Sequence, residues 1–342
     1  MMVWLFLIAT GGISLLLTSA LRRYALAKSL IDVPNARSSH TAPTPRGGGV
    51  AIVLSFLFLL PVLPLFSLLS WSSTWGLLGA GAGIAVLGFL DDHGHIAARW
   101  RLLGHFSAAV WALFWLGGAP PLTVMGATFD LGWVGVVLAI LYLVWMLNLY
   151  NFMDGIDGLA SLEAIFVCLS AALTYASMGL AALAWAPLLL SFAVAGFLYW
   201  NFPPAKIFMG DAGSGFLGVT LGIFSLQAAW ASPSLIWVWV ILMGVFIVDA
   251  TFTLIRRLVR GDKVYEAHRS HAYQYASRKF GRHLPVTLTV GLVNVVWLLP
   301  VALCVALLGL DGLLGVIIAY IPLVLLAWLF HAGAVEKNES AQ

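Results

Sequence analysis

Residues 132–158 read GWVGVVLAILYLVWMLNLYNFMDGIDG, an uncharged apolar segment that runs directly into an acidic one. The apolar part, 132–148, approaches the length of about 20 residues with which a helix crosses a bilayer. The second part places Asn, Asp and Gly where such a helix would end. This stretch therefore predicts a membrane-spanning helix with a polar site at one end.

The composition extends this pattern to the whole chain. Hydrophobic residues make up 62% and charged residues 9% of the sequence, whereas soluble domains carry roughly 25% charged residues. We expect an all-α, polytopic integral membrane protein, because helices satisfy their backbone hydrogen bonds within lipid and the segments lack barrel alternation. Eleven spans are predicted, at 2–21, 47–69, 75–90, 102–117, 132–148, 158–178, 181–200, 212–231, 235–256, 285–308 and 312–330.

The positions of the charges predict the orientation. Arg22 and Arg23 follow the first apolar segment and no basic residue precedes it, so this segment does not look like a cleaved signal peptide. Alternating from there, all 17 Lys and Arg fall on one side. The positive-inside rule makes that side cytoplasmic, with the N-terminus outside and the C-terminus cytoplasmic. The net charge of +3 then reflects topology and does not indicate nucleic-acid binding.

We expect one transmembrane domain over 1–335, followed by a polar tail at 336–342. Cys168 and Cys304 stand alone in different apolar segments, so neither a disulfide framework nor a thiolate metal site is expected. The chemistry should lie in the cytoplasmic loops, which are 22–46, 91–101, 148–157, 201–214 and 257–284.

Asp91 and Asp92 end an apolar segment as two adjacent carboxylates. Such a pair can bind a cation, or one member can hold a proton because the other is charged. The alternative is a pair of solvated caps at a helix end.

In the next loop, spacing of three places Asn148, Asn151 and Asp154 on one helix face. Gly155 lets backbone approach a ligand closely. Asp157 resembles an N-cap for a helix that opens at Gly158, which explains one polar residue of the four.

The third loop carries Asn201, Phe208 and Asp211 around Pro203-Pro204. Asp211 stands at another N-cap position and also suits Mg²⁺, which takes a few carboxylates, waters and phosphate oxygens. The alternative is an ordinary N-cap with a packing Phe208.

The most basic loop contains His268, Arg269 and His271, with the two His expected on one helix face. No Glu lies between them in the metalloprotease arrangement, so we do not expect zinc. They can serve as hydrogen-bond donors for phosphate or sugar, or belong to a basic interfacial helix on anionic lipid. Deeper in the membrane, Asp249 can contact a lipid phosphate or pair with a basic neighbour.

A fifth stretch precedes the second span. Arg37, His40 and Arg46 supply donors beside Gly47–Gly49. The glycines can cradle a phosphate with their N–H groups or begin a helix-packing segment.

Together the motifs DxPNxRSxH…PTPRGGG, GFLDD, NxxNFMDGIDGLA, NxPPAKIFMGDAGS and HRSHxYQ, over about 11–290, resemble the polyprenyl-phosphate N-acetylhexosamine-1-phosphate transferases, the superfamily of WecA and MraY. Within it the chain is similar to the WbpL-like enzymes that initiate O-antigen synthesis. The resemblance implies a reaction in which a UDP-linked N-acetylated sugar donates its sugar-1-phosphate to undecaprenyl phosphate and UMP is released. The sugar would be GlcNAc, FucNAc or a relative. The resemblance also implies that the membrane is the bacterial inner membrane, with the N-terminus periplasmic.

The resemblance also implies roles for residues. Asp91, Asp92 and Asp211 match catalytic positions, and Mg²⁺, with Mn²⁺ as a substitute, would bind Asp211, Asp92 and Asp154. The other matching positions would bind the substrates: Asn148, Asn151, Asp154, Gly155, Asp157, Asn201 and Phe208 form the polar and uridine pocket, and His40, Arg46, His268, Arg269 and His271 supply donors. Either carboxylate of the pair can be the base, and a covalent aspartyl intermediate is the rival mechanism.

The chain differs from the MraY branch at two places, and both differences bear on which sugar is the donor. His95 stands where the MraY branch has Lys, which moves the expected phosphate contact to Arg99 or Arg101, and HRSH replaces the His-His-His-Phe-Glu run of that branch. The peptidoglycan or teichoic-acid branch remains the alternative, and a homodimer stays open. A transporter or flippase would place charged or broken helices near the bilayer midplane, whereas the acids here lie at helix ends.

Overall fold

The computed structural model describes residues 2–34, 40, 42–94, 96–263 and 268–335, and these are largely helical, as expected. The predicted tail lies outside the described residues. The helices are α1 (Met2–Ala27), α2 (Val50–Leu59), α3 (Val62–Leu65), α4 (Trp71–Gly94), α5 (Ala98–Leu116), α6 (Gly132–Phe152), α7 (Leu159–Ser177), η1 (Ala181–Ala184), α8 (Trp185–Asn201), α9 (Asp211–Ala231), α10 (Ser234–Leu242), α11 (Gly244–Arg260), α12 (Ala272–Phe280), α13 (His283–Val293), η2 (Asn294–Leu298), α14 (Leu299–Leu307) and α15 (Gly312–Leu329).

Each of the eleven predicted spans has a helix at its place, but their lengths differ. Within the described ranges, eight helices are long and apolar enough to cross a membrane, and a ninth span is possible if α10 and α11 count as one. These two helices meet at 74°. Segment 47–69 becomes the shorter run Val50–Leu65, and segment 102–117 falls on α5, which ends at Leu116. The prediction of eleven full spans therefore stays a prediction.

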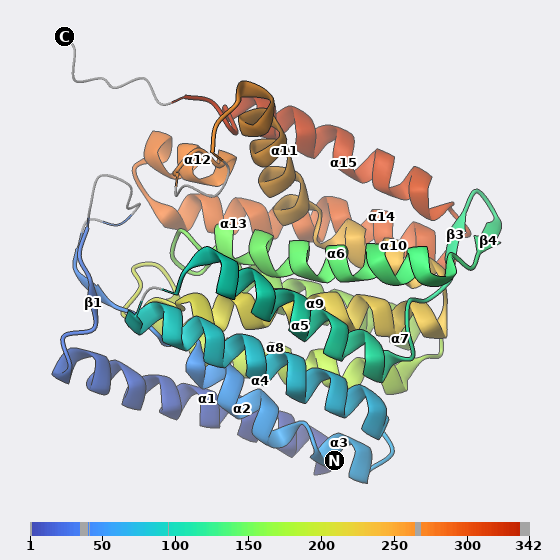
Figure 1. The fold of residues 1–342 in the computed structure, drawn as a ribbon, viewed down its shortest axis with the longest axis horizontal. Coiled ribbons are helices and arrows are strands. Elements are labelled where there is room, and N and C mark those ends of the chain that lie inside the picture. Colours follow the sequence, from blue (N-terminus) through green and yellow to red (C-terminus); the bar gives the residue numbers. More distant parts are fainter. Residues whose placement is uncertain (1, 35–39, 41, 95, 264–267, 336–342) are drawn as a thin grey trace.

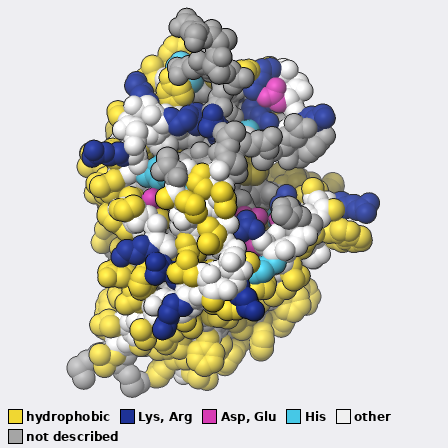
Figure 2. All heavy atoms as spheres, turned by 90° about the vertical axis from the view of Figure 1, so that its left-hand side faces the viewer, with side chains coloured by type: hydrophobic (Ala, Val, Ile, Leu, Met, Phe, Trp, Pro, Cys, Tyr) yellow, Lys and Arg dark blue, Asp and Glu magenta, His cyan; other side chains and the backbone are white. Residues whose placement is uncertain are grey.

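The long helices lie side by side, with the loops predicted to be cytoplasmic at one end (left in Figure 1) and a small hairpin, β3 (Leu122–Val124) and β4 (Ala127–Phe129), at the other. Figure 2 looks onto the first end, where many Lys and Arg side chains gather around acidic ones. We call it the charged end.

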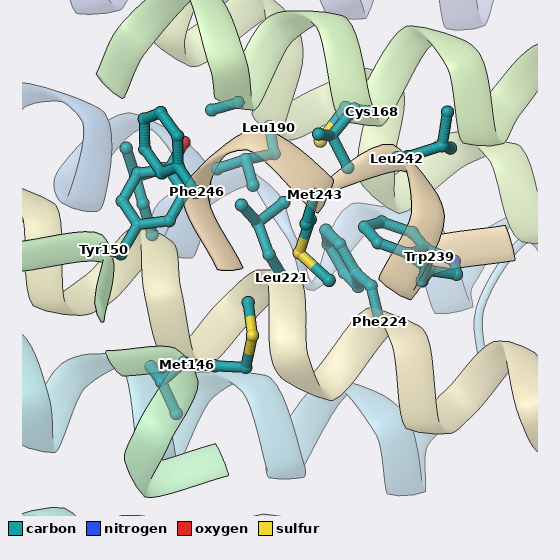
Figure 3. Close-up of a cluster of buried hydrophobic side chains, with 14 of the residues drawn as sticks. Met146, Tyr150, Cys168, Leu190, Leu221, Phe224, Trp239, Leu242, Met243 and Phe246 are labelled. Carbon is teal, nitrogen blue, oxygen red and sulfur yellow. The ribbon is translucent and has the colours of Figure 1, made fainter. Parts of the chain in front are cut away.

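The centre of the bundle is α9. Of its apolar stretch of 18 residues, 94% is buried inside the protein. It packs against α2, α4, α5, α6, α7 and α10. Beside it, Met243 marks the break between α10 and α11 and is surrounded by Phe224, Trp239 and Phe246 (Figure 3). The break is thus filled by apolar side chains and carries none of the charges that a transporter site would need.

Glycines bring other backbones into contact with α9. A Cβ on Gly49 would lie 2.5 Å from the Cα of Gly213, and one on Gly88 would lie 2.6 Å from the carbonyl carbon of Asp211. Such distances leave no room for a side chain. The glycines therefore fix how closely the charged ends of α2 and α4 approach the first turn of α9.

We expect Gly49→Ala to destabilise the fold, because α2 and α9 must separate to admit the methyl group. Overpacking of this kind costs about 1–3 kcal/mol, which should lower the midpoint of thermal unfolding in detergent. Gly83→Ala is the matched control, since no heavy atom lies within 4 Å of the added Cβ. Equal midpoints for the two variants would contradict this account of the packing.

Candidate functional site

A cavity of about 290 Å³ opens at the charged end. It brings together loops that are far apart in the sequence. The expected site residues that line it are His40, Arg46, Asp92, Asn151, Asp154, Gly155, Asp157, Asn201, Phe208 and Asp211.

A smaller cavity of about 70 Å³ lies beside it and is lined by Asp91 and Asn148. Asn151 and Asp211 line both cavities. The two members of the Asp pair therefore face different cavities, as expected for neighbours on a helix, which point about 100° apart.

The partners of the two carboxylates also differ. Asp91 accepts hydrogen bonds from Arg101 at 2.5 Å and from the Ile96 N–H at 2.7 Å. One oxygen of Asp92 lies 3.8 Å from Arg46, which also donates to the Asp92 carbonyl. The other, Oδ2, is buried and forms no hydrogen bond of ordinary length among the described residues, although the carboxylate lies near the N–H groups of Asp211 and Ala212 at the start of α9. Asp91 is thus held by its surroundings, whereas Asp92 retains an oxygen that can bind a ligand.

Asp154 lies in the turn after α6, and burial raises the pKa of its carboxyl well above the usual range. The nearby charges of Asp211, Asp92 and Asp157 raise that pKa further. A bound cation would reverse this repulsion. Within the described ranges, no three acidic, His or Cys side chains are grouped closely enough to hold a metal alone. The arrangement fits Mg²⁺, which uses one or two carboxylates together with waters and substrate phosphates.

Gly155 is explained first by packing. A Cβ at this position would lie 2.1 Å from the hydroxyl oxygen of Tyr273, and that hydroxyl donates to the Phe152 carbonyl at 2.8 Å. Tyr273 belongs to α12, so α12 supports the turn that carries Asn151 and Asp154. The glycine makes this contact possible, and its backbone also lines the larger cavity.

The prediction that Asp157 is an N-cap is wrong. The N-cap of α7 is Gly158, and no side chain caps it. The Asp157 carboxylate instead accepts from the Ala205 N–H at 3.0 Å and lies 3.1 Å from Nδ1 of His283. A helix that starts one residue later leaves this carboxylate to connect the second and third loops and the start of α13.

Asn201 completes the same connection. Its Oδ1 accepts from the Gly158 N–H at 3.1 Å and from the Ser161 hydroxyl at 3.3 Å, and its Nδ2 donates to the Ile207 carbonyl at 3.1 Å. The residue is 3% exposed, so most of its hydrogen-bonding capacity serves the frame of the cavity.

Asp211 does not act as an N-cap either. It is the first residue of α9, Gly210 precedes it as the N-cap, and no side-chain cap is formed. Its carboxylate therefore lines the two cavities. Phe208 lines the larger one, with its ring edge to face with His40 at a centroid distance of 4.8 Å.

The glycines of the fifth stretch do not offer a free phosphate cradle. The N–H groups of Gly48 and Gly49 donate to the carbonyls of Phe208 and Met209, both at 2.9 Å. The packing interpretation is therefore correct for these two residues. Nearby, β1 (Ile31–Asp32) pairs with β2 (Thr44–Pro45). Arg37 and His95 lie outside the described residues.

His268, Arg269 and His271 are not among the residues that line either cavity at the charged end. The two His were expected on one helix face, but α12 begins only after them, and their rings lie 5.0 Å apart. His271 is 3% exposed, with Nδ1 3.3 Å from Asp249 Oδ1. A phosphate or sugar contact from this loop stays a prediction.

Asp249 accepts hydrogen bonds from the N–H groups of Ala272 at 2.9 Å and Tyr273 at 3.0 Å, in addition to its contact with His271. Of its two expected roles, pairing with a basic neighbour is the one found. Because a carboxylate at a helix N-terminus is favourable, Asp249 anchors the start of α12.

Sequence reasoning missed several residues of the larger cavity, among them Asp32, Gln274 and His283. Asp32 and Gln274 lie within the motifs and could have been found there. His283 carries no local signal, because only folding brings it to Asp157. Outside the cavity, Glu163 in α7 is 1% exposed and accepts a hydrogen bond from Asn294 at 2.5 Å.

The sequence is also similar to proteins of a known family. Residues 74–229 match glycosyl transferase family 4. A Bacillus subtilis protein named probable undecaprenyl-phosphate N-acetylglucosaminyl 1-phosphate transferase is 31% identical over 76% of this chain and 73% of its own. A Thermotoga maritima undecaprenyl-phosphate alpha-N-acetylglucosaminyl 1-phosphate transferase is 28% identical over 79% and 80%. A Moorella thermoacetica phospho-N-acetylmuramoyl-pentapeptide-transferase is 34% identical over 54% and 62%.

Asp157→Ala should loosen the frame of the cavity, because it leaves the Ala205 N–H without its acceptor and removes the contact between the carboxylate and His283. A lost partner of this kind costs about 1–3 kcal/mol, seen as a lower midpoint of thermal unfolding. Asp157→Asn is the control, because its amide oxygen still accepts from Ala205, and it should cost less than half as much. If neither variant changes the midpoint, Asp157 does not support the frame.

Proposed function

This chain belongs to glycosyl transferase family 4, the polyprenyl-phosphate N-acetylhexosamine-1-phosphate transferases, and we propose that it moves N-acetylhexosamine-1-phosphate from a UDP-sugar to undecaprenyl phosphate and releases UMP. It is a multi-pass membrane transferase of sugar phosphate to polyprenyl phosphate. The proposal includes Mg²⁺ dependence, an inner-membrane location and a cytoplasmic site.

The observation that carries the proposal is the meeting of Asp92, Asp154 and Asp211 in one cavity at the charged end of the bundle. A polyprenyl phosphate holds its phosphate at headgroup level while its tail stays in lipid. Carboxylates at helix ends lie at that level. A soluble nucleotide sugar can reach the same cavity from the water side.

The buried Oδ2 of Asp92, which forms no hydrogen bond of ordinary length among the described residues, supports a cation site here. Mg²⁺ would be held by one or two of the carboxylates of Asp211, Asp154 and Asp92, together with water and donor phosphate oxygens, and it would neutralise charge on the pyrophosphate. Asp91, which is bound to Arg101 and Ile96, is suited to fix the end of α4.

The remaining roles in the transfer reaction are assigned to residues of this chain. Asp92 would accept a proton from the acceptor phosphate when the metal is held by Asp211 and Asp154. An oxygen of that phosphate attacks the phosphorus that carries the sugar, and the bond from this phosphorus to the UMP oxygen breaks. Arg46, beside Asp92, would donate to a phosphate oxygen, and Phe208 would stack on the uracil. A covalent aspartyl intermediate is the alternative route.

For the donor we propose UDP-GlcNAc or a 6-deoxy relative such as UDP-FucNAc, and for the pathway a WbpL-like initiation of O-antigen. Relatives named for N-acetylglucosaminyl transfer support the first donor. A relative named for phospho-N-acetylmuramoyl-pentapeptide transfer keeps the peptidoglycan branch as the second candidate.

The first test measures UMP release by purified protein with undecaprenyl phosphate, Mg²⁺ and each of UDP-GlcNAc, UDP-FucNAc, UDP-GalNAc and UDP-muramoyl-pentapeptide. We expect release that requires lipid and Mg²⁺ and is abolished in Asp211→Ala at every Mg²⁺ concentration. The control is Asp130→Ala, which removes a carboxylate that binds the Gly132 N–H at the opposite end and should keep full activity. Release by Asp211→Ala at the wild-type rate would refute the metal assignment.

Phe208→Ala should raise the KM for the donor and leave kcat nearly unchanged, because stacking on the uracil stabilises ground state and transition state alike. Loss of one base–aromatic stack, worth about 1–3 kcal/mol, corresponds to a KM higher by about 5- to 150-fold. Phe202→Ala is the matched control, since Phe202 is exposed and does not line the cavity. An unchanged donor KM in Phe208→Ala would remove the uridine assignment.

A further inference from the structure

Two cationic side chains meet at one tryptophan on the charged end, outside the cavities. The guanidinium carbon of Arg22 lies 5.9 Å from the centre of the Trp200 ring, and Nζ of Lys206 lies 5.4 Å from it. Lys206 is also 5.4 Å from the ring of Tyr199. The three elements involved are the end of α1, the end of α8 and the loop that follows α8.

Printed hydrogen bonds hold this group in place. The indole N–H of Trp200 donates to the Leu15 carbonyl at 3.1 Å, which fixes the ring against α1. Nε of Arg22 donates to the Lys206 carbonyl at 3.2 Å, and the Lys206 N–H donates to the Trp200 carbonyl at 2.8 Å. These hydrogen bonds therefore hold the two charged side chains beside the same ring, so their proximity is a feature of the fold.

The charges lack a counterion of the protein's own. Arg22 and Lys206 form no ion pair with any carboxylate in the described part of the chain. Two like charges beside one ring repel each other, and an anion between them would offset that repulsion. Trp and Tyr are typical of the membrane interface, which is the depth of lipid phosphates.

We propose that Arg22, Lys206 and the indole of Trp200 form a binding site for the phosphate headgroup of an anionic membrane phospholipid. The guanidinium and ammonium groups donate to the phosphate oxygens, and the indole packs against the glycerol and upper acyl region. The site differs from the general attraction of a basic surface, because it depends on the geometry of these side chains and not on the net charge of the end.

The test compares wild-type protein in nanodiscs of phosphatidylcholine with protein in nanodiscs that also contain phosphatidylglycerol. Phosphatidylglycerol retained by the protein is counted by native mass spectrometry, and the midpoint of thermal unfolding is measured alongside. Neither readout depends on transferase activity. The variant is R22A/K206A. The control is R23A/K28A, which removes the same amount of charge from exposed positions on or just beyond the end of α1.

We expect phosphatidylglycerol to raise the wild-type midpoint and to be retained at least about 10-fold less well by R22A/K206A, because the loss of a hydrogen bond between charged groups costs about 1.5–3 kcal/mol. R23A/K28A should behave like wild type. Equal losses in both double variants would overturn the proposal in favour of diffuse attraction, and no loss in R22A/K206A would overturn it outright.

Two further experiments complete the test. Inorganic phosphate is added to protein in phosphatidylcholine nanodiscs; a rise in the midpoint that matches the lipid effect and vanishes in R22A/K206A would show a site for soluble phosphate and overturn the lipid assignment. If R22A/K206A does not fold, R22Q/K206Q keeps the packing of the stems over Trp200 and removes both charges, and the same loss of phosphatidylglycerol is expected.

Discussion

The site depends on how closely three backbones meet at the first turn of α9. Gly88 and Gly49 leave no space for a side chain between their helices and residues 211–213. Because of this contact, the end of α4 lies directly beside Asp211, and Asp92 reaches the cavity that Asp211 lines. In lipid, where no hydrophobic force draws helices together, small residues at contacts are the ordinary way to achieve such packing. The same glycines that pack the bundle thereby set the spacing of its carboxylates.

That spacing has an electrostatic consequence. Asp92, Asp154 and Asp211 lie close enough to disfavour one another's ionised forms, as the raised pKa of Asp154 indicates. Buried carboxylates that repel each other are costly to keep, and a fold selected only for stability would replace them. The proposed Mg²⁺ and donor pyrophosphate would account for their presence, since the cation would attract the carboxylates and the phosphates would supply the ligands that the protein lacks.

Much of the fold and of the cavity could be predicted from the sequence. The features that could not be predicted are those that leave no local pattern in it. Hydropathy located a helix for each predicted span, and the motifs identified ten residues of the larger cavity, because both signals are contiguous in the chain. Three kinds of feature were missed. The 74° break at Met243 lies in an unbroken apolar run, so hydropathy carries no sign of it. The different surroundings of Asp91 and Asp92 arise from Arg101 and Arg46, which only folding brings to them. The place of His283 beside Asp157 has the same cause.

The motif residues also divide into two functions that the sequence alone does not separate. Asn201 and Asp157 use their polar atoms mainly on backbone and side-chain groups of neighbouring loops, whereas Asp92 keeps a buried oxygen that forms no hydrogen bond of ordinary length in the described part of the chain. A polar residue in a motif can therefore hold the frame or face the ligand, and the deciding observation is where its hydrogen bonds go. By that criterion Asp249 and His271 belong to the frame, since together they anchor α12, and α12 in turn supports the Asn151–Asp154 turn through Tyr273. The helix α12 therefore links Asp249, at its N-terminus, to the turn that carries Asp154.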